Sequence, residues 1–354
     1  MLKRMFTSLL LAVLSLVLVL PVTALADYSF SFLPRREYQG TIYEARPSAE
    51  ITTVLLIGYD HQSYGTVKEL HGYSNGGQSD FMLLLVVDHE NRTIRQLQID
   101  RDTMTPVYVT DITGKQHKRS SLQICLSHAY GDTREKNNAN AVLAVETLLG
   151  IEAPGDGAQI DWYLAMDISG IRLLNDLLGG VTITIDEDMT AYDPEMIAGR
   201  TMKLSGKQAE HFCRGRYYVG DQTNASRMKR QRQYLNAASE VLRQRMKEDI
   251  DFGMYLLEEM GVIYDRSTAA SADPFSFSDP VKGTPSGLLE GYYLTTNESQ
   301  SEIVGLLARA IDYELLETET LPGEHVIGTS GYIEFRMEKD AALRWALDVF
   351  YRSE

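Results

Sequence analysis

The sequence is poor in cysteine, with only Cys125 and Cys213 among its 354 residues. It contains no Cys-x-x-Cys pair and no two histidines four residues apart. This lack argues against a zinc site, which needs clustered ligands of that kind. Two cysteines in a chain outside the cytoplasm would allow one disulfide, and two buried thiols that pack as small hydrophobic side chains are the alternative. Both interpretations stay open at this point.

Net positive charge is also missing. Lysine and arginine total 34 against 49 aspartate and glutamate residues, so the formal net charge is −15. A chain with this charge repels nucleic acid and anionic membrane surfaces, which argues against DNA binding. The hydrophobic fraction of 44% and the charged fraction of 23% are those of a folded globular protein.

Long hydrophobic runs are absent except near the N-terminus. A positively charged start precedes an apolar run from Leu9 to Leu20, and a small-residue segment ends at Ala26. This order is typical of a secretory signal peptide cleaved after Ala26, and an uncleaved membrane anchor over residues 1–26 is the alternative. Both interpretations place residues 27–354 outside the cytoplasmic membrane, either secreted or at the outer face of the cell membrane.

The rest of the chain alternates strand-like apolar runs with helix-like segments. Residues 27–50 have no clear periodicity and are predicted to form an extracytoplasmic linker. Residues 51–354 are predicted to form one domain, in which the Ser- and Pro-rich residues 266–288 are a surface insertion or linker. The alternation predicts a three-layer α/β/α sandwich with a central mixed sheet. The predicted strands are 51–57, 81–87, 93–99, 160–166 and 181–185, and the predicted helices are 138–149, 205–213, 224–247, 298–316 and 338–351.

Positive charge gathers in one segment of the chain. Residues 200–232 carry nine lysines and arginines against two acids, Glu210 and Asp221, so this segment has a local charge of +7 and the remainder has −22. A positive site within a negative molecule indicates a specific small anion as the ligand rather than a polyanionic surface.

The spacing of the basic residues separates two kinds of position. Arg214 and Arg216 are two residues apart, which places both on one side of an extended segment. Arg227, Arg230 and Gln231 share one face of the predicted helix with Tyr234. Guanidinium groups bind phosphate through two parallel hydrogen bonds, and a helix N-terminus adds backbone donors. We therefore predict that these side chains bind a phosphate or pyrophosphate.

Lys229 and Arg232 lie off that helical face. Charged residues in such positions usually form a solvated surface. We therefore predict that these two side chains face solvent and do not contact the ligand.

Two groups of acidic residues stand at the ends of predicted strands. Asp60 follows the first strand and Asp80 precedes the second, where carboxylates can hold Mg²⁺ while phosphate oxygens complete its shell. Asp100 and Asp102 flank Arg101. Two interpretations of this second group are open: an arginine oriented toward the same ligand, or a salt-bridged turn.

Taken together and in order, these motifs resemble the LytR-CpsA-Psr family. The resemblance covers about residues 51–350. It rests on the segments Leu55-Leu56-Ile57-Gly58-Tyr59-Asp60, Ser79-Asp80, Gln98-Ile99-Asp100-Arg101-Asp102-Thr103, Ala129-Tyr130-Gly131, Leu178-Gly179-Gly180-Val181, Gly206-Lys207-Gln208-Ala209, Arg214-Gly215-Arg216-Tyr217, Arg227-Met228-Lys229-Arg230-Gln231-Arg232, Thr296-Asn297 and Leu321-Pro322-Gly323.

The resemblance implies an enzyme of cell-wall biogenesis, mostly found in Gram-positive bacteria. Members transfer a glycopolymer, such as teichoic acid or capsule, from a polyprenyl-pyrophosphate carrier to peptidoglycan, usually to the 6-hydroxyl of N-acetylmuramic acid. By position, Asp60 and Asp80 would hold Mg²⁺. The pyrophosphate would be bound by Arg101, Arg214, Arg216 and Arg227, with Gln231 beside them.

Phosphoryl transfer depends mainly on positioning and charge neutralisation, which suits this set of residues. Arg101, Arg214 and Arg216 would stabilise the reacting phosphate, and Asp102 or Asp221 would accept the proton of the attacking hydroxyl.

The sequence departs from the family pattern at Gln62, Gln78 and Gln123, where the family often has basic residues. Two alternatives stay open. One is a hydrolase of polyprenyl pyrophosphates, in which water replaces the sugar hydroxyl and the residues are nearly the same. The other is a non-catalytic protein that binds the lipid carrier or the cell wall, which the loss of three positive charges allows.

Overall fold

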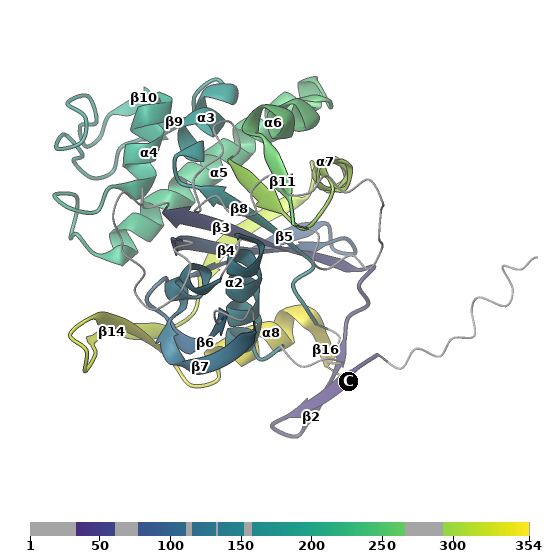
Figure 1. The fold of residues 1–354 in the computed structure, drawn as a ribbon. Helices are drawn as coiled ribbons and strands as arrows, with labels where there is room; N and C mark the ends of the chain where they lie inside the picture. Colours follow the sequence, from purple (N-terminus) through teal and green to yellow (C-terminus); the bar gives the residue numbers. More distant parts are fainter. Residues whose placement is uncertain are drawn as a thin grey trace, which may run out of the picture.

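The computed structural model describes residues 33–60, 77–110, 115–131, 134–151, 158–265 and 293–353 (Figure 1). Its centre is a seven-stranded sheet in the order β11-β12-β8-β3-β4-β5-β13. Parallel and antiparallel neighbours alternate irregularly across it, so the predicted mixed sheet is confirmed. The strands are β3 (Ile51–Asp60), β4 (Gln78–Asp88), β5 (Thr93–Ile99), β8 (Trp162–Asp167), β11 (Val262–Tyr264), β12 (Leu294–Thr296) and β13 (Glu314–Thr320).

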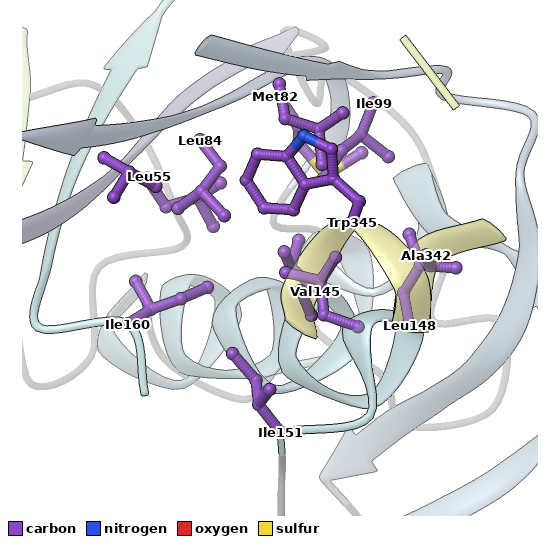
Figure 2. Packing of buried hydrophobic residues seen from close by; sticks show 14 of the residues in the cluster. Leu55, Met82, Leu84, Ile99, Val145, Leu148, Ile151, Ile160, Ala342 and Trp345 are labelled. Carbon is purple, nitrogen blue, oxygen red and sulfur yellow. The ribbon is translucent and has the colours of Figure 1, made fainter. Parts of the chain in front are cut away.

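Helices cover both faces of this sheet, which confirms the three-layer sandwich. One face packs against α2 (Arg134–Leu149) and α8 (Ala341–Phe350), and Figure 2 shows Leu55 and Leu84 of the sheet facing Val145 and Trp345 of these helices. The other face carries the remaining described helices: α3 (Gly170–Leu177), α4 (Gly206–Arg214), α5 (Asn224–Glu248), α6 (Phe252–Met260) and α7 (Gln300–Arg309).

The central strands form where the sequence has continuous apolar runs. Both β3 and β4 are covered by helices on two sides, so neither face has to be polar. Strand β4 continues into β5 through a short turn as an antiparallel hairpin, with Met82 opposite Ile99. The antiparallel pairing of β3 with β4 brings the C-terminal end of β3 beside the N-terminal end of β4, where the candidate acidic residues lie.

One predicted helix was too long. The helix predicted over 298–316 is shorter, because α7 ends at Arg309 and the chain then enters β13, which pairs in parallel with β5 at the edge of the sheet. The partner of β13 is distant in sequence, so local periodicity does not reveal it. The strand predicted over 181–185 forms as β9 (Thr182–Thr184) and pairs with β10 (Thr201–Lys203) in a separate two-stranded sheet.

The predicted linker over residues 27–50 also requires correction. Strands β1 (Arg35–Tyr38) and β2 (Thr41–Ala45) form a hairpin, and β2 pairs with β16 (Tyr351–Ser353) at the C-terminal end of the fold. The fold therefore includes the part of this segment that the structure describes, from Arg35 onward. A short hairpin of mixed polarity gains its stability from that third strand, which a local pattern cannot show.

The remaining domain predictions fall outside the described residues. These are the signal peptide or anchor over residues 1–26 and the insertion over 266–288. Within the described part of the chain, no helix combines the length and the apolar character needed to cross a membrane.

Arg46 ties the N-terminal hairpin to the central sheet. Its guanidinium donates to the Asp88 carboxylate at 2.8 Å, and the backbone N–H of Asn91 donates to the same carboxylate at 2.8 Å. Burial alone would raise the pKa of Asp88, but the hydrogen bonds from Arg46 and Asn91 outweigh it and lower this pKa to about 2. A carboxylate with a lowered pKa stabilises the folded state above its ordinary pKa.

Replacing Asp88 with asparagine should therefore change the pH dependence of stability. The wild-type contribution is fully present above about pH 4 and is lost as the pH falls toward about 2, so Asp88→Asn should cost about 2 kcal/mol at neutral pH and little at the acid end. Urea unfolding of both proteins across this range measures the difference. If the free energy of unfolding depends on pH in the same way in both proteins, the Asp88 carboxylate contributes nothing to the pH dependence of stability.

Candidate functional site

The site begins with an irregularity where β3 meets β4. Gly58 pairs with Phe81 and Tyr59 pairs with Ser79, so Asp80 has no partner in the ladder and forms a β-bulge. A Cβ atom on Gly58 would lie 3.0 Å from the Cβ of Phe81, so a residue without a side chain suits this close approach. Bulges redirect side chains beside functional sites, and this one presents Asp80 to two arginines.

Asp80 is held between Arg101 and Arg227. Arg101, in the turn after β5, ion-pairs through Nη1 with Asp80 Oδ1, and Arg227, in the first turn of α5, donates from Nη1 to Asp80 Oδ2 at 3.1 Å. The Nη2 atom of Arg101 also donates to Gln78 Oε1 and lies 3.2 Å from the Cys125 sulfur. Asp80 thus joins Arg101, which is 21 positions away in the sequence, to Arg227, which is 147 positions away.

Asp60 pairs with a different arginine. The Nη2 atom of Arg214 lies 3.0 and 2.9 Å from the two carboxylate oxygens of Asp60, and its Nη1 atom lies 3.4 Å from Glu210. Arg214 is the last residue of α4, which begins at a capping box formed by Ser205 and Gln208. The Arg214 side chain is 49% exposed, so its guanidinium can also contact a ligand from solvent.

Arg216 lies in the loop between α4 and α5. Its Nε atom donates to the Gln222 carbonyl at 3.2 Å and its backbone N–H donates to the Tyr192 hydroxyl at 3.1 Å. The charge of Arg216 opposes the rise in the pKa of Asp102 and contributes to lowering that of Arg227. Arg216 therefore belongs to the same electrostatic cluster as the residues at the strand ends.

The buried face of α5 is the one that the helical spacing predicts. Its N-cap is Thr223, and Arg227, Arg230, Gln231 and Tyr234 are all buried against the fold. Arginine and glutamine are rarely buried without partners, so their hydrogen bonds decide what each can do.

Arg230, which is predicted to contact the ligand, has its hydrogen-bond partners within the protein. It ion-pairs with Glu187 and donates to the carbonyls of Phe212 and Gly215 and to the hydroxyl of Ser226. All three guanidinium nitrogens are thus engaged within the protein. Arg230 therefore fixes the C-terminal end of α4. This contact also positions Arg214 and Arg216, which lie next to the two bound carbonyls.

Gln231 has a similar position. It donates to the Cys213 carbonyl at 3.3 Å and accepts from Gln98 at 3.4 Å. Of the two residues predicted to face solvent, Lys229 is exposed and pairs with Asp186 at 3.1 Å, as expected. The prediction for Arg232 was wrong. Its side chain does not face solvent but is half-buried and donates to Gln98 Oε1 at 2.6 Å.

Asp102 lies in a second acidic group that contains a residue missed by the sequence analysis. His325, on β14 (Gly323–Ile327), contacts Asp100 with its Nε2 atom 2.9 Å from Oδ2. Asp100 also accepts from the Asn224 side chain and from the backbone N–H of Asp102. His325 comes from a strand more than two hundred residues away, and no local motif marks it.

The two candidate proton acceptors differ in environment. Burial and the neighbouring charge of Asp100 raise the pKa of Asp102 above its ordinary value. Asp221 is exposed, and its hydrogen bonds from the Thr223 hydroxyl and backbone N–H lower its pKa. A carboxylate with a raised pKa is the stronger base, so this comparison favours Asp102.

Two sets of residues could hold a cation. Among the described residues, Asp100, Asp102 and His325 are the group of three whose ligand atoms lie within 4.8 Å of one another. Asp60 and Asp80 are instead paired with arginines. Mg²⁺ commonly takes one or two carboxylates and completes its shell with substrate phosphates, so Asp60 and Asp80 carry the type of ligand group that this ion takes.

The two cysteines are free and buried. The alternative of two buried thiols therefore holds, and the disulfide does not form. Burial raises the pKa of Cys125 to about 12, and that of Cys213 is raised as well. Both side chains thus remain neutral thiols, because burial outweighs the opposing charge of the Arg101 guanidinium beside Cys125.

Known proteins resemble this chain in sequence. The chain is similar to the polyisoprenyl-teichoic acid–peptidoglycan teichoic acid transferase TagU of Bacillus cereus, with 25% identity over 202 residues, 57% of this chain and 56% of the relative. It is also similar to biofilm regulatory protein A of Streptococcus mutans, with 26% identity over 191 residues, 52% of this chain and 42% of the relative. The chain thus spans about half the length of the curated relatives it matches.

Solved structures share the fold. TagV of B. subtilis superposes with a TM-score of 0.56 at 18% identity, covering 84% of this chain and 96% of that one. A structure of TagT bound to LI-WTA superposes with a TM-score of 0.56 at 16% identity, covering 86% and 92%. A family model, the LytR_cpsA_psr family, matches residues 36–249. This match spans more than half of the chain and contains the three arginines that pair with Asp60 and Asp80, so the protein belongs to the LytR_cpsA_psr family.

Proposed function

We propose that this protein is an extracytoplasmic phosphotransferase of cell-wall assembly. It would move a glycopolymer from a polyprenyl-pyrophosphate carrier to peptidoglycan, onto the 6-hydroxyl of N-acetylmuramic acid. The observation that carries this proposal is that Arg101 and Arg227 pair with Asp80 and Arg214 pairs with Asp60 at the strand ends, while the charge of Arg216 acts on Arg227. The membrane contact would come from the N-terminal segment or from the lipid substrate itself.

The arginines would bind the pyrophosphate by exchanging partners. Arg214 and Arg216 are exposed enough to turn from Asp60 and the Gln222 carbonyl toward phosphate oxygens. Arg101 and Arg227 are more buried and would present fixed donors from the other side. Asp60, released by Arg214, would then hold Mg²⁺ together with the remaining lone pairs of Asp80, and the ion would neutralise charge on the pyrophosphate.

The chemical step is a displacement at the glycan-side phosphorus. The acceptor hydroxyl oxygen forms a new bond to that phosphorus, the bond to the bridging oxygen breaks, and polyprenyl phosphate leaves. Asp102 would take the proton of the hydroxyl, since it is the buried carboxylate with a raised pKa. The guanidinium groups would stabilise the charge that develops on the leaving phosphate.

A reconstituted reaction tests this function. The purified protein is incubated with lipid-pyrophosphoryl-glycan, Mg²⁺ and peptidoglycan oligomers, and a glycan–peptidoglycan product is expected. Arg214→Ala and Arg216→Ala should each lower its rate by about 10²-fold, because each removes a charged donor to the transferred group. Lys229→Ala is the matched control, since it removes an exposed positive charge on α5 and should leave the rate unchanged.

Other outcomes identify the alternatives. Release of free carrier without a peptidoglycan product would mean that water is the acceptor and that the protein is a hydrolase. Substrate that binds but stays intact would mean a non-catalytic binding protein. Full transfer by both arginine variants would overturn the assignment of the reaction to this site.

A further inference from the structure

Exposed aromatic side chains flank the arginine site on two sides. Tyr217 and Tyr218, in the loop between α4 and α5, are 66% and 80% exposed, and Tyr332, at the tip of the β14–β15 hairpin, is 70% exposed. Ile327 and Ile333 are exposed at the same tip. Figure 1 shows β14 projecting on the side of the molecule where α4 also lies. Exposed apolar groups that gather beside a site mark an interaction surface.

The hairpin is fixed to the site by hydrogen bonds at its base. Strand β15 (Ile333–Met337) pairs with β14, the Phe335 N–H donates to the Asp102 carbonyl at 2.8 Å, and Gln123 Nε2 donates to the Ile333 carbonyl at 2.7 Å. His325 adds its contact with Asp100. The position of Tyr332 relative to Asp102 is therefore set by the fold.

The loop between α4 and α5 is also held in a defined shape. Tyr218 has a positive φ of 61° and its backbone N–H donates to Gln222 Oε1 at 3.3 Å. Gln222 in turn has a positive φ of 62° and accepts from Arg216 through its carbonyl. Positive φ is unfavourable for side chains of this kind, and such strain persists where the surrounding structure requires it. This loop therefore presents two tyrosines immediately beside Arg216.

We propose that the hairpin tip and the α4–α5 loop form the two walls of a binding surface for the acceptor glycan strand. This inference rests on the proposed transferase function. The acceptor hydroxyl must reach the phosphorus held by the arginines, so the rest of the acceptor has to cover the surface next to them. Tyrosine has a flat apolar ring with a polar hydroxyl, which suits the apolar faces and hydroxyl groups of sugar rings.

A glycan fits this surface better than a membrane does. The hairpin carries Glu324 and Glu334 and its arginine, Arg336, is already paired with Glu334 at 3.2 Å. An anionic lipid surface is recognised by clusters of lysine and arginine, which this tip lacks. The charge on the hairpin thus favours a neutral, hydroxyl-rich partner.

Direct binding measurements test the proposal. Soluble glycan-strand fragments of peptidoglycan are titrated into the full chain and into Tyr332→Ala, Tyr217→Ala and the double variant. Each single change should weaken fragment binding by about tenfold, as loss of a stacked aromatic does, and the double change should weaken it further. Tyr255→Ala is the matched control, because Tyr255 is 46% exposed on α6 and should leave binding unchanged.

Two further readouts separate this surface from the arginine site. Binding of lipid-pyrophosphoryl-glycan should stay unchanged in the tyrosine variants, whereas their KM for the acceptor should rise. Unchanged fragment affinity in the double variant would overturn the proposal, and so would loss of binding to phosphatidylglycerol vesicles without loss of fragment binding. Because fragment binding needs no turnover, a failed transfer reaction with intact fragment binding would overturn the proposed function alone.

Discussion

Replacing Arg101 with alanine is expected to slow transfer by about 10²- to 10³-fold, the effect of losing one fixed donor to the reacting group. Arg101 contacts Asp80, Gln78 and Cys125 from a position next to Asp102, so its guanidinium lies between the proposed cation ligands and the proposed base. Asp80 keeps its bond to Arg227, so the fold should survive the change. The rate is measured in the reconstituted reaction.

A second variant tests whether geometry or charge is decisive. Arg101→Lys keeps the positive charge but loses the planar fork, so it should recover only part of the rate. Lys229→Ala again serves as the control for a general loss of positive charge on the molecule. Transfer by Arg101→Ala at a rate close to that of the wild type would place the reacting phosphate elsewhere.

Replacing Arg230 with methionine is expected to destabilise the fold by about 3–5 kcal/mol, as the loss of one partner from a buried ion pair does. Glu187 would lose its guanidinium partner, and the carbonyls of Phe212 and Gly215 would lose their donor. Guanidinium chloride unfolding at neutral pH measures the change. Lys229→Met is the matched control on the same helix, and loss of its exposed pair with Asp186 should cost less than about 1 kcal/mol.

The result for Arg230 also decides between its two possible roles. If Arg230→Met keeps wild-type stability and loses affinity for the pyrophosphate, the ligand contact predicted from helical spacing is right. If stability falls while Glu187→Met and Arg230→Met together recover part of it, the arginine acts through its bond to Glu187. The second outcome is expected, because all three guanidinium nitrogens have partners within the protein.

Local sequence patterns predict much of the central architecture. The apolar runs that became β3 and β4 can only be buried between two layers of helices, so the sandwich follows from them. The buried face of α5 follows from its helical period, which separates Arg227 and Tyr234 from Lys229. Asp60 and Asp80 could be placed at strand ends because the apolar runs mark where β3 ends and β4 begins.

The partners of these side chains depended on pairings between distant segments. Three contacts could not be predicted from local periodicity, because each depends on which segments meet in the folded chain. They are the bulge at Asp80, the contact of His325 with Asp100 and the pairing of β2 with β16. The sequence by itself determined the layers, the inward face of α5 and the set of arginines. The tertiary structure alone decided which arginines point to an open site and which are buried. A buried charge must be paired, so its partner is the acceptor that the fold places beside it.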